Sequence, residues 1–234
     1  MQLLGFLKFG KLLTTGGTML LSVVAYAFVF GWPYAVGFVV LLFAHEMGHY
    51  VAARQRNLDV GAPAFIPFVG AWVALKDLPH DAETEAYVGL GGPFVGTLAS
   101  LACYFLARQS DSMLLLALSY AGFFLNLFNL IPLSPLDGGR ITAVLTPRVW
   151  LLGVPVLIGV FIWNPSPMLI VIAVLAAPQV WRALRYDSAA PENQAYYGVS
   201  AEARVTYAAY YLILLVVLGT MSYEVHEMLG VVRG

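Results

Sequence analysis

Long apolar stretches alternate with short polar segments along most of this chain. A membrane-crossing helix needs about 20 mainly apolar residues. We predict transmembrane helices over residues 14–30, 34–53, 86–107, 113–131, 149–163, 167–184 and 205–223. The fifth is the weakest, because it is short and contains Pro155. The pattern predicts an all-α, polytopic membrane protein with about six or seven transmembrane helices.

Two apolar segments do not fit this helical pattern. Residues 1–13 contain Lys8 and Lys11, and we expect a short amphipathic segment in the membrane interface. Residues 60–75 are apolar but are interrupted by Gly61, Pro63, Pro67 and Gly70. Irregular backbone at membrane depth occurs only against protein or a water-filled cavity. This segment is therefore either an extended, hairpin-like loop that dips into the membrane or a loop in the interface.

Composition agrees with a membrane location. The chain has 234 residues, of which 60% are hydrophobic and 11% charged, and its mean hydropathy is +0.80. A soluble domain has about 25% charged residues, so the chain is predicted to be an integral membrane protein. The net charge of −1 argues against a nucleic-acid partner. Cys103 is the single cysteine, which excludes an intramolecular disulfide.

The basic residues predict the orientation in the membrane, because cytoplasmic loops are enriched in Lys and Arg. With a cytoplasmic N-terminus, ten basic residues lie inside: Lys8, Lys11, Arg54, Arg56, Lys76, Arg140, Arg148, Arg182, Arg185 and Arg204. Only Arg108 and Arg233 then lie outside. We therefore expect the N-terminus on the cytoplasmic side. No transit peptide precedes the first predicted helix, which favours a bacterial or archaeal cell membrane.

The most informative motif lies near the end of the second predicted helix. Residues 45–49 read His-Glu-Met-Gly-His, an HExxH pattern. Residues four apart share one face of a helix, so His45 and His49 can present two imidazoles to one metal ion. Glu46 lies beside them, where a carboxylate can act as a general base toward water. This is the zinc-peptidase arrangement. Ionisable residues in an apolar run are costly to bury in lipid, which marks them as functional.

A third ligand is expected after the fourth predicted helix. A catalytic zinc with two histidines usually takes a third protein ligand, often a carboxylate. Asp137 is the candidate, because Gly138 and Gly139 permit a tight backbone that directs the carboxylate inward. In the predicted topology, Asp137 lies at the membrane face where the second helix ends, so it can meet the HExxH motif. His80 and His226 lie in polar segments, and we expect neither to be a ligand.

These motifs together resemble the site-2 protease family of intramembrane zinc metalloproteases, in a short form without a PDZ domain. The resemblance rests on the HExxH motif, on Gly92-Pro93 and on the Asn-x-x-Pro…Leu-Asp-Gly pattern that begins at Asn129. It covers residues 43–140. It implies one integral membrane domain over residues 1–234, with a catalytic core over 34–140 and accessory helices over 14–30 and 149–223.

The resemblance also implies roles for individual residues. His45, His49 and Asp137 would bind Zn2+. Glu46 would be the catalytic base. Asn129 would be a polar group near the site that contacts the substrate or the oxyanion, although capping of the helix end is an equally good interpretation.

Hydrolysis of peptide bonds within or beside transmembrane segments of membrane-protein substrates is the activity that the resemblance implies. The lipid bilayer is then the environment, the active site opens to the cytoplasm, and an upstream protease or an adaptor is an expected partner. Two other classes stay open: a membrane zinc-binding or adaptor protein without proteolysis, and a transporter. The retained Glu46 argues against the first, since zinc storage needs no base. The lack of an inverted repeat argues against the second.

Overall fold

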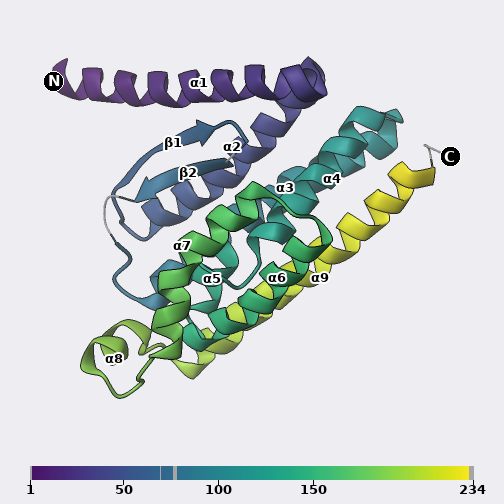
Figure 1. Cartoon of the computed structure of the whole chain (residues 1–234). Helices are drawn as coiled ribbons and strands as arrows, with labels where there is room; N and C mark the ends of the chain where they lie inside the picture. Colours follow the sequence, from purple (N-terminus) through teal and green to yellow (C-terminus); the bar gives the residue numbers. More distant parts are fainter. Residues whose placement is uncertain (1, 69, 76–77, 232–234) are drawn as a thin grey trace.

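The computed structural model describes residues 2–68, 70–75 and 78–231 and is predominantly helical (Figure 1). The first part of the chain forms α1 (Gln2–Phe30), α2 (Trp32–Gln55), β1 (Val60–Ile66), β2 (Gly70–Leu75), α3 (Ala82–Ser110) and α4 (Met113–Asn129). The second part forms α5 (Asp137–Thr142), the 3-10 helix η1 (Pro147–Leu152), α6 (Gly153–Trp163), α7 (Pro167–Leu184), α8 (Pro191–Tyr197) and α9 (Ala201–Val231).

Several of these helices can cross a membrane. Within the described residues, α2, α3, α7 and α9 are long and apolar enough to do so, and Thr14–Phe30, Met113–Asn129 and Pro147–Trp163 are shorter apolar segments. Large apolar side chains face outward along the helices; Ile162 is 75% exposed and Val205 is 70% exposed. Extended apolar surface of this kind marks a membrane-facing region. The predicted class, a polytopic helical membrane protein, is confirmed, and the number of crossings stays a prediction.

The N-terminal region differs from the prediction in one respect. Residues 2–30 form one continuous helix, α1, with no break between the expected interfacial segment and the expected first transmembrane helix. In Figure 1, α1 lies across one end of the other helices. It ends at Gly31, whose φ of 83° suits glycine, and α2 begins at the next residue with Pro33 in its first turn.

The apolar segment over residues 60–75 is a β-hairpin, as one of the two interpretations expected. β1 and β2 pair antiparallel, with Phe65 opposite Ala71 and Ile66 opposite Gly70. The hairpin lies between α1 and α2 (Figure 1). Thr15 Oγ1 donates to the Pro63 carbonyl at 2.7 Å. The backbone N–H of Phe68, at the hairpin tip, donates to Tyr26 Oη at 3.1 Å. Both contacts tie the hairpin to α1.

Small residues bring α2 and α3 into close contact. A Cβ atom on Gly91 would lie 2.5 Å from the Gly48 carbonyl oxygen and 2.8 Å from Ala52 Cβ. Glycines at such crossings allow helix backbones to approach closely in a membrane. α3 also packs on α4, and α4 packs on α9 in an apolar cluster that includes Phe123 and Leu218. The HExxH helix is thereby held against α3 and α4.

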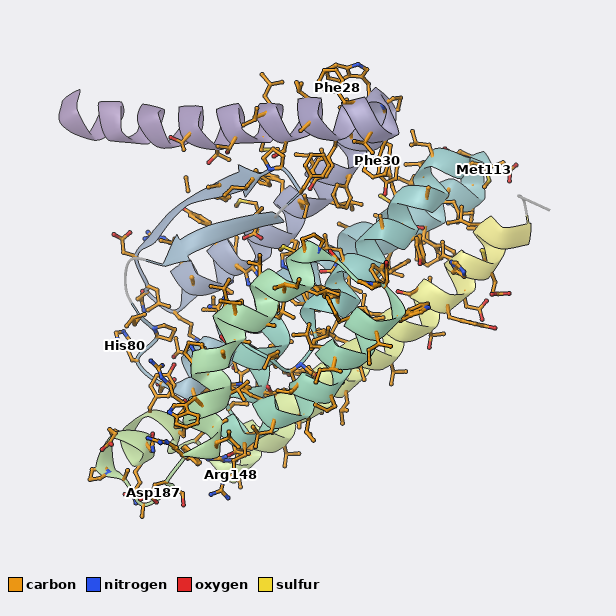
Figure 2. The ribbon with its side chains drawn as sticks, in the orientation of Figure 1. Phe28, Phe30, His80, Met113, Arg148 and Asp187 are labelled. Atoms are coloured by element: carbon orange, nitrogen blue, oxygen red, sulfur yellow. The ribbon has the colours of Figure 1, made fainter. Side chains whose placement is uncertain are left out.

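Figure 2 labels side chains at both ends of the helical bundle. Phe28, Phe30 and Met113 mark the end where α1 stops and α4 begins. The opposite end carries polar side chains, labelled His80, Arg148 and Asp187. The C-terminal end of α2 and the N-terminal ends of α3 and α9 lie toward this polar end (Figure 1).

Candidate metal centre

The two histidines of the HExxH motif lie on the inner face of α2. His45 and His49 are one helical turn apart and are buried, with exposed fractions of 3% and 7%. Their Nε2 atoms lie 3.1 Å from each other. The helical spacing therefore places two imidazole nitrogens side by side. Both rings lie on the side of α2 that contacts α3 and α4.

Asp137 reaches the same point from the first residue of α5. The residue after it, Gly138, packs against the turn that follows α4. A Cβ atom on Gly138 would collide with the Leu130 carbonyl group in this turn. Trp150 Nε1 donates a hydrogen bond of 2.8 Å to the Gly139 carbonyl and holds the next residue of the turn. The tight backbone thus directs the Asp137 carboxylate toward α2.

The donor atoms have the spacing of a tetrahedral metal site. Asp137 Oδ2 lies 3.1 Å from His45 Nε2 and 3.2 Å from His49 Nε2. Ligands at about 2.0–2.1 Å from a tetrahedral Zn2+ are about 3.3–3.4 Å apart. The observed separations are slightly shorter, so a small outward movement of the ligands accommodates the ion. Among the described residues, His45, His49 and Asp137 form the single group of this kind.

Hydrogen bonds to the other ring nitrogens determine the tautomers of the histidines. His49 Nδ1 lies 2.8 Å from the Val88 carbonyl oxygen, which only accepts, so Nδ1 carries the proton. His45 Nδ1 lies 2.8 Å from Asn126 Oδ1. The Asn126 amide nitrogen donates to the Gly122 carbonyl at 2.7 Å, which fixes its oxygen toward His45. In their neutral form, both imidazoles therefore present an unprotonated Nε2 toward Asp137.

In this form of the histidines, three acceptor atoms converge. Two Nε2 lone pairs and a carboxylate meet in a buried space, where mutual repulsion is costly without a cation. Outer partners on both Nδ1 atoms are a regular feature of metal-binding histidines. The chemistry of the donors fits a divalent metal such as zinc.

Gly92 on α3 provides the space for this group. A Cβ atom at this position would collide with the imidazole of His49 and would lie 2.7 Å from His45 Nε2. In the sequence, Gly92 stands out as part of the Gly92-Pro93 motif. Its position against the ligands depends on how α2 and α3 face each other.

Glu46 is buried beside the three ligands and is 5% exposed. It is close enough to interact electrostatically with both histidines and with Asp137. No described residue donates a hydrogen bond to its carboxylate, which leaves both oxygens available to a water molecule. Arg140 lies on the other side of the site, with Nη1 3.9 Å from Asp137 Oδ1.

A polar contact lies on α3 toward the polar end of the molecule. Glu85 and Gly92 are seven residues apart and share a face of the helix. Tyr196 Oη of α8 donates to Glu85 Oε2 at 2.7 Å. Burial, together with the neighbouring Glu85 carboxylate, raises the pKa of the Tyr196 phenol, so the hydroxyl keeps its proton and remains a donor. The segment before α9 is therefore attached to the start of α3.

Asn129, predicted as a substrate or oxyanion residue, ends α4 and is half-buried. Its side chain makes no hydrogen bond with a described residue. The amide that contacts a ligand is Asn126, three residues earlier, which the sequence analysis did not select. His80 is exposed at the polar end (Figure 2), and His226 lies against the ring of Tyr120. A polar residue one turn before the motif was the available signal for Asn126.

Replacing Asn126 with leucine is expected to weaken zinc binding by about 10–100-fold, the usual effect of losing an outer partner of a ligand. The Nδ1 proton of His45 would lose its acceptor, and the ring would no longer be held in one tautomer. Competition with a chromophoric chelator measures the affinity. Ser119→Ala is the matched control, because Ser119 is also buried on α4 but bonds only within its own helix. Equal affinity of Asn126→Leu and wild type would contradict the assignment.

The fold and the site define a multi-pass helical membrane protein with a buried His-His-Asp metal centre on an HExxH helix. Residues 33–112 match the model of peptidase family M50. That segment contains α2 after its first residue, the hairpin and α3, whereas Asp137 lies beyond it. Over this segment, about a third of its length, the chain is similar to this peptidase family.

Individual relatives also match part of the chain. A zinc metalloprotease of Methanocaldococcus jannaschii is 32% identical over 117 residues, which is 46% of this chain and 33% of the relative. A chloroplastic protein of Arabidopsis thaliana, named as a probable zinc metalloprotease, is 32% identical over 89 residues, which is 34% of this chain and 16% of the relative. The chain thus spans a third or less of the length of these relatives. A solved site-2 protease from M. jannaschii has a TM-score of 0.47 and 20% identity, covering 71% of this chain and 85% of that chain.

Proposed function

We propose that this protein is an intramembrane zinc metalloprotease that hydrolyses peptide bonds within or beside transmembrane segments of membrane-protein substrates. The observation that carries the proposal is the meeting of two imidazole nitrogens and a carboxylate oxygen, 3.1–3.2 Å apart, next to the buried Glu46. The match of residues 33–112 to the M50 family model and the names of the relatives support it. A site for zinc storage alone has no use for a second carboxylate that is not a ligand.

Each residue of the site has a distinct task in the proposed reaction. His45, His49 and Asp137 would hold zinc, which when bound lowers the pKa of water toward about 7 and polarises the scissile carbonyl. Glu46 accepts a proton from the attacking water on a carboxylate oxygen and transfers it to the leaving amine nitrogen. The amide of Asn129 donates a hydrogen bond to the developing oxyanion.

The β-hairpin offers a way to hold the substrate. A transmembrane helix hides its peptide carbonyls, so a substrate must unwind locally before it is cleaved. We propose that the unwound segment pairs with a free edge of the hairpin, where backbone hydrogen bonds replace those that the helix lost. The position of the hairpin beside the HExxH helix supports this step.

Tyr26→Phe tests this use of the hairpin. The hydroxyl that accepts the Phe68 N–H would be lost, and the tip would be held less firmly. We expect substrate cleavage in proteoliposomes to slow about 2–10-fold, since one hydrogen bond contributes about 0.5–1.5 kcal/mol, while zinc content stays unchanged. Tyr34→Phe is the control, because the Tyr34 hydroxyl makes no hydrogen bond with a described residue. A cleavage rate equal to that of wild type would argue against a positioned hairpin.

The proposed activity is tested by comparing the membrane and soluble proteomes of cells that carry either the wild-type protein or Glu46→Gln. We expect membrane proteins to accumulate in the variant, with matching soluble fragments in wild type alone. These proteins would be the substrates. Identical proteomes, with zinc present in both purified proteins, would instead indicate a zinc-binding or adaptor protein without proteolysis.

In the proposed topology, the N-terminus and the opening of the site face the cytoplasm of a bacterial or archaeal cell. The polar end of the bundle, with Arg148 and the start of α9, would be the cytoplasmic end. The metal centre lies about 9–15 Å inside the end of α2, counted at about 1.5 Å per residue from Gln55. A protease that trims the substrate beforehand, or an adaptor, would supply selectivity.

A further inference from the structure

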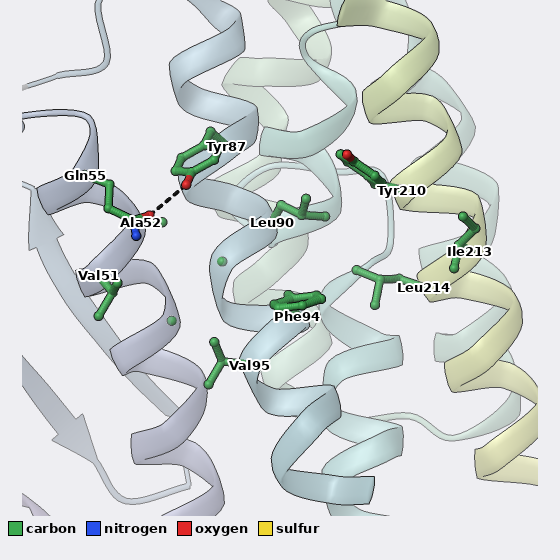
Figure 3. A pocket seen from close by; sticks show the side chains of 12 residues that line it. Val51, Ala52, Gln55, Tyr87, Leu90, Phe94, Val95, Tyr210, Ile213 and Leu214 are labelled. Atoms are coloured by element: carbon green, nitrogen blue, oxygen red, sulfur yellow. Dashed lines mark hydrogen bonds between the residues drawn. The ribbon is translucent and has the colours of Figure 1, made fainter.

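An apolar groove separate from the metal centre runs along the outside of the bundle. It lies between α2 and α9, with α3 as its floor, and its volume is about 590 Å³. Figure 3 shows Val51 of α2 on one side, Phe94 and Val95 of α3 at the base, and Ile213 of α9 on the other side. The lining is almost entirely apolar, apart from Gln55 and two tyrosines at one end.

The groove runs along α2 and α3, both of which are long and apolar enough to cross a membrane. Its polar end lies at Gln55, the last residue of α2, where Tyr87 Oη donates to Gln55 Oε1 at 2.7 Å (Figure 3). From there it extends along α2 to Gly48 and along α3 to Val95. These are seven and eight residues further, or about 10–12 Å of helix. The apolar part therefore lies at the depth of acyl chains, and the polar end lies near the headgroups.

A second, polar cavity of about 410 Å³ continues the groove beyond this end. The two cavities share Tyr87, Leu90 and Tyr210 as lining residues. The added part is lined by Arg56, Glu83 and Glu202 together with small hydroxyl residues of α9. One continuous cleft therefore changes from charged to apolar in the same direction as one leaflet of a bilayer.

Arg56 is positioned to bind a phosphate group. Its guanidinium stacks on the Tyr87 ring at 4.3 Å, and Nη2 donates to Tyr207 Oη at 3.4 Å. Nη2 lies 3.7 Å from Glu83 Oε1, which is an ion pair longer than a hydrogen bond. A guanidinium has five N–H donors. The N–H groups that the described partners do not use can donate two parallel hydrogen bonds to phosphate oxygens, the geometry that arginine favours.

The two carboxylates of the polar cavity bear on which lipid headgroup it can bind. Glu83 and Glu202 give the polar cavity two carboxylates against one guanidinium. This arrangement repels a lipid with net negative charge but matches a headgroup that has both a phosphate and an ammonium. A primary ammonium can also donate hydrogen bonds to the carboxylates, which a quaternary one cannot. We propose that this cleft binds one aminophospholipid of the phosphatidylethanolamine type, with its phosphate on Arg56, its amine near Glu83 and Glu202, and an acyl chain in the apolar groove.

The proposal is tested on the full chain in detergent by native mass spectrometry after incubation with phosphatidylethanolamine, phosphatidylglycerol or phosphatidylcholine. We expect one phosphatidylethanolamine per chain to survive detergent exchange, and the other two lipids to be retained more weakly. Ile213→Trp should fill the groove and abolish retention. Leu212→Trp is the matched control on the adjacent position, since Leu212 has a similar exposed fraction but does not line the groove. Both variants should keep their zinc.

Arg56→Gln provides an independent arm, because it changes the headgroup end without filling the groove. We expect about tenfold weaker retention of phosphatidylethanolamine, the loss typical of a hydrogen bond to a charged group. Equal retention of the three lipids by wild type, or unchanged retention in both Ile213→Trp and Arg56→Gln, would overturn the proposal. Capture of a substrate polypeptide instead of lipid by a photoreactive residue at position 213 would also overturn it. None of these outcomes depends on proteolysis.

Discussion

Glu46→Gln is expected to retain one zinc per chain while slowing peptide-bond hydrolysis by about 10²–10⁴-fold. Gln has the size of Glu but cannot accept a proton from water or deliver it to the leaving amine, and general acid–base catalysis contributes about this factor. Glu46 makes no hydrogen bond with a described residue, so the substitution breaks none of the contacts that position the ligands. Single-turnover cleavage in proteoliposomes measures the rate, and elemental analysis measures the zinc.

The control for this experiment is Glu227→Gln, an exposed residue near the end of α9 that touches no part of the site. It should match wild type in both rate and metal content. A Glu46→Gln protein that cleaved at the wild-type rate would rule out the proposed base. A protein that lost its zinc would show instead that Glu46 contributes to the metal site.

Gly92→Ala is expected to abolish both zinc binding and cleavage while leaving the helices intact. The added methyl group would lie 2.5 Å from His49 Cε1 and 2.7 Å from His45 Nε2, far inside van der Waals contact. Metal sites tolerate errors of only about 0.2 Å in ligand distance, so displaced imidazoles cannot both reach the ion. We expect the affinity to fall by more than about a hundredfold, beyond the usual effect of an outer partner.

Two measurements distinguish this local effect from unfolding. Alanine favours helix more than glycine does, by about 1 kcal/mol, so the circular dichroism of Gly92→Ala should stay helical while the bound zinc disappears. Gly219→Ala in α9 is the matched control, since a Cβ atom there has nothing within 4 Å. That variant should keep its metal and its activity. Full zinc occupancy in Gly92→Ala would show that α3 can move away from the ligands.

The sequence by itself determined the class of protein and predicted which residues come together in the candidate site. The lengths of the apolar runs predicted the helices, because a bilayer sets the length that must be apolar; α7 has the predicted bounds, and α4 differs from them by two residues. The four-residue spacing of His45 and His49 placed both rings on one face, since neighbours at that spacing are set by the helix itself. The Asp-Gly turn made Asp137 the candidate for the third ligand.

The tertiary structure decided what surrounds those residues. Asn126 was not selected because its contact with His45 joins residues 81 apart, and it depends on the rotation of α4 against α2. The Val88 carbonyl and the position of Gly92 likewise follow from the depth at which α3 crosses α2. The continuous α1 and the pairing of the hairpin depend on contacts between them. A helical period fixes neighbours within one helix, but the rotation and depth of one helix against another result from packing of the whole bundle.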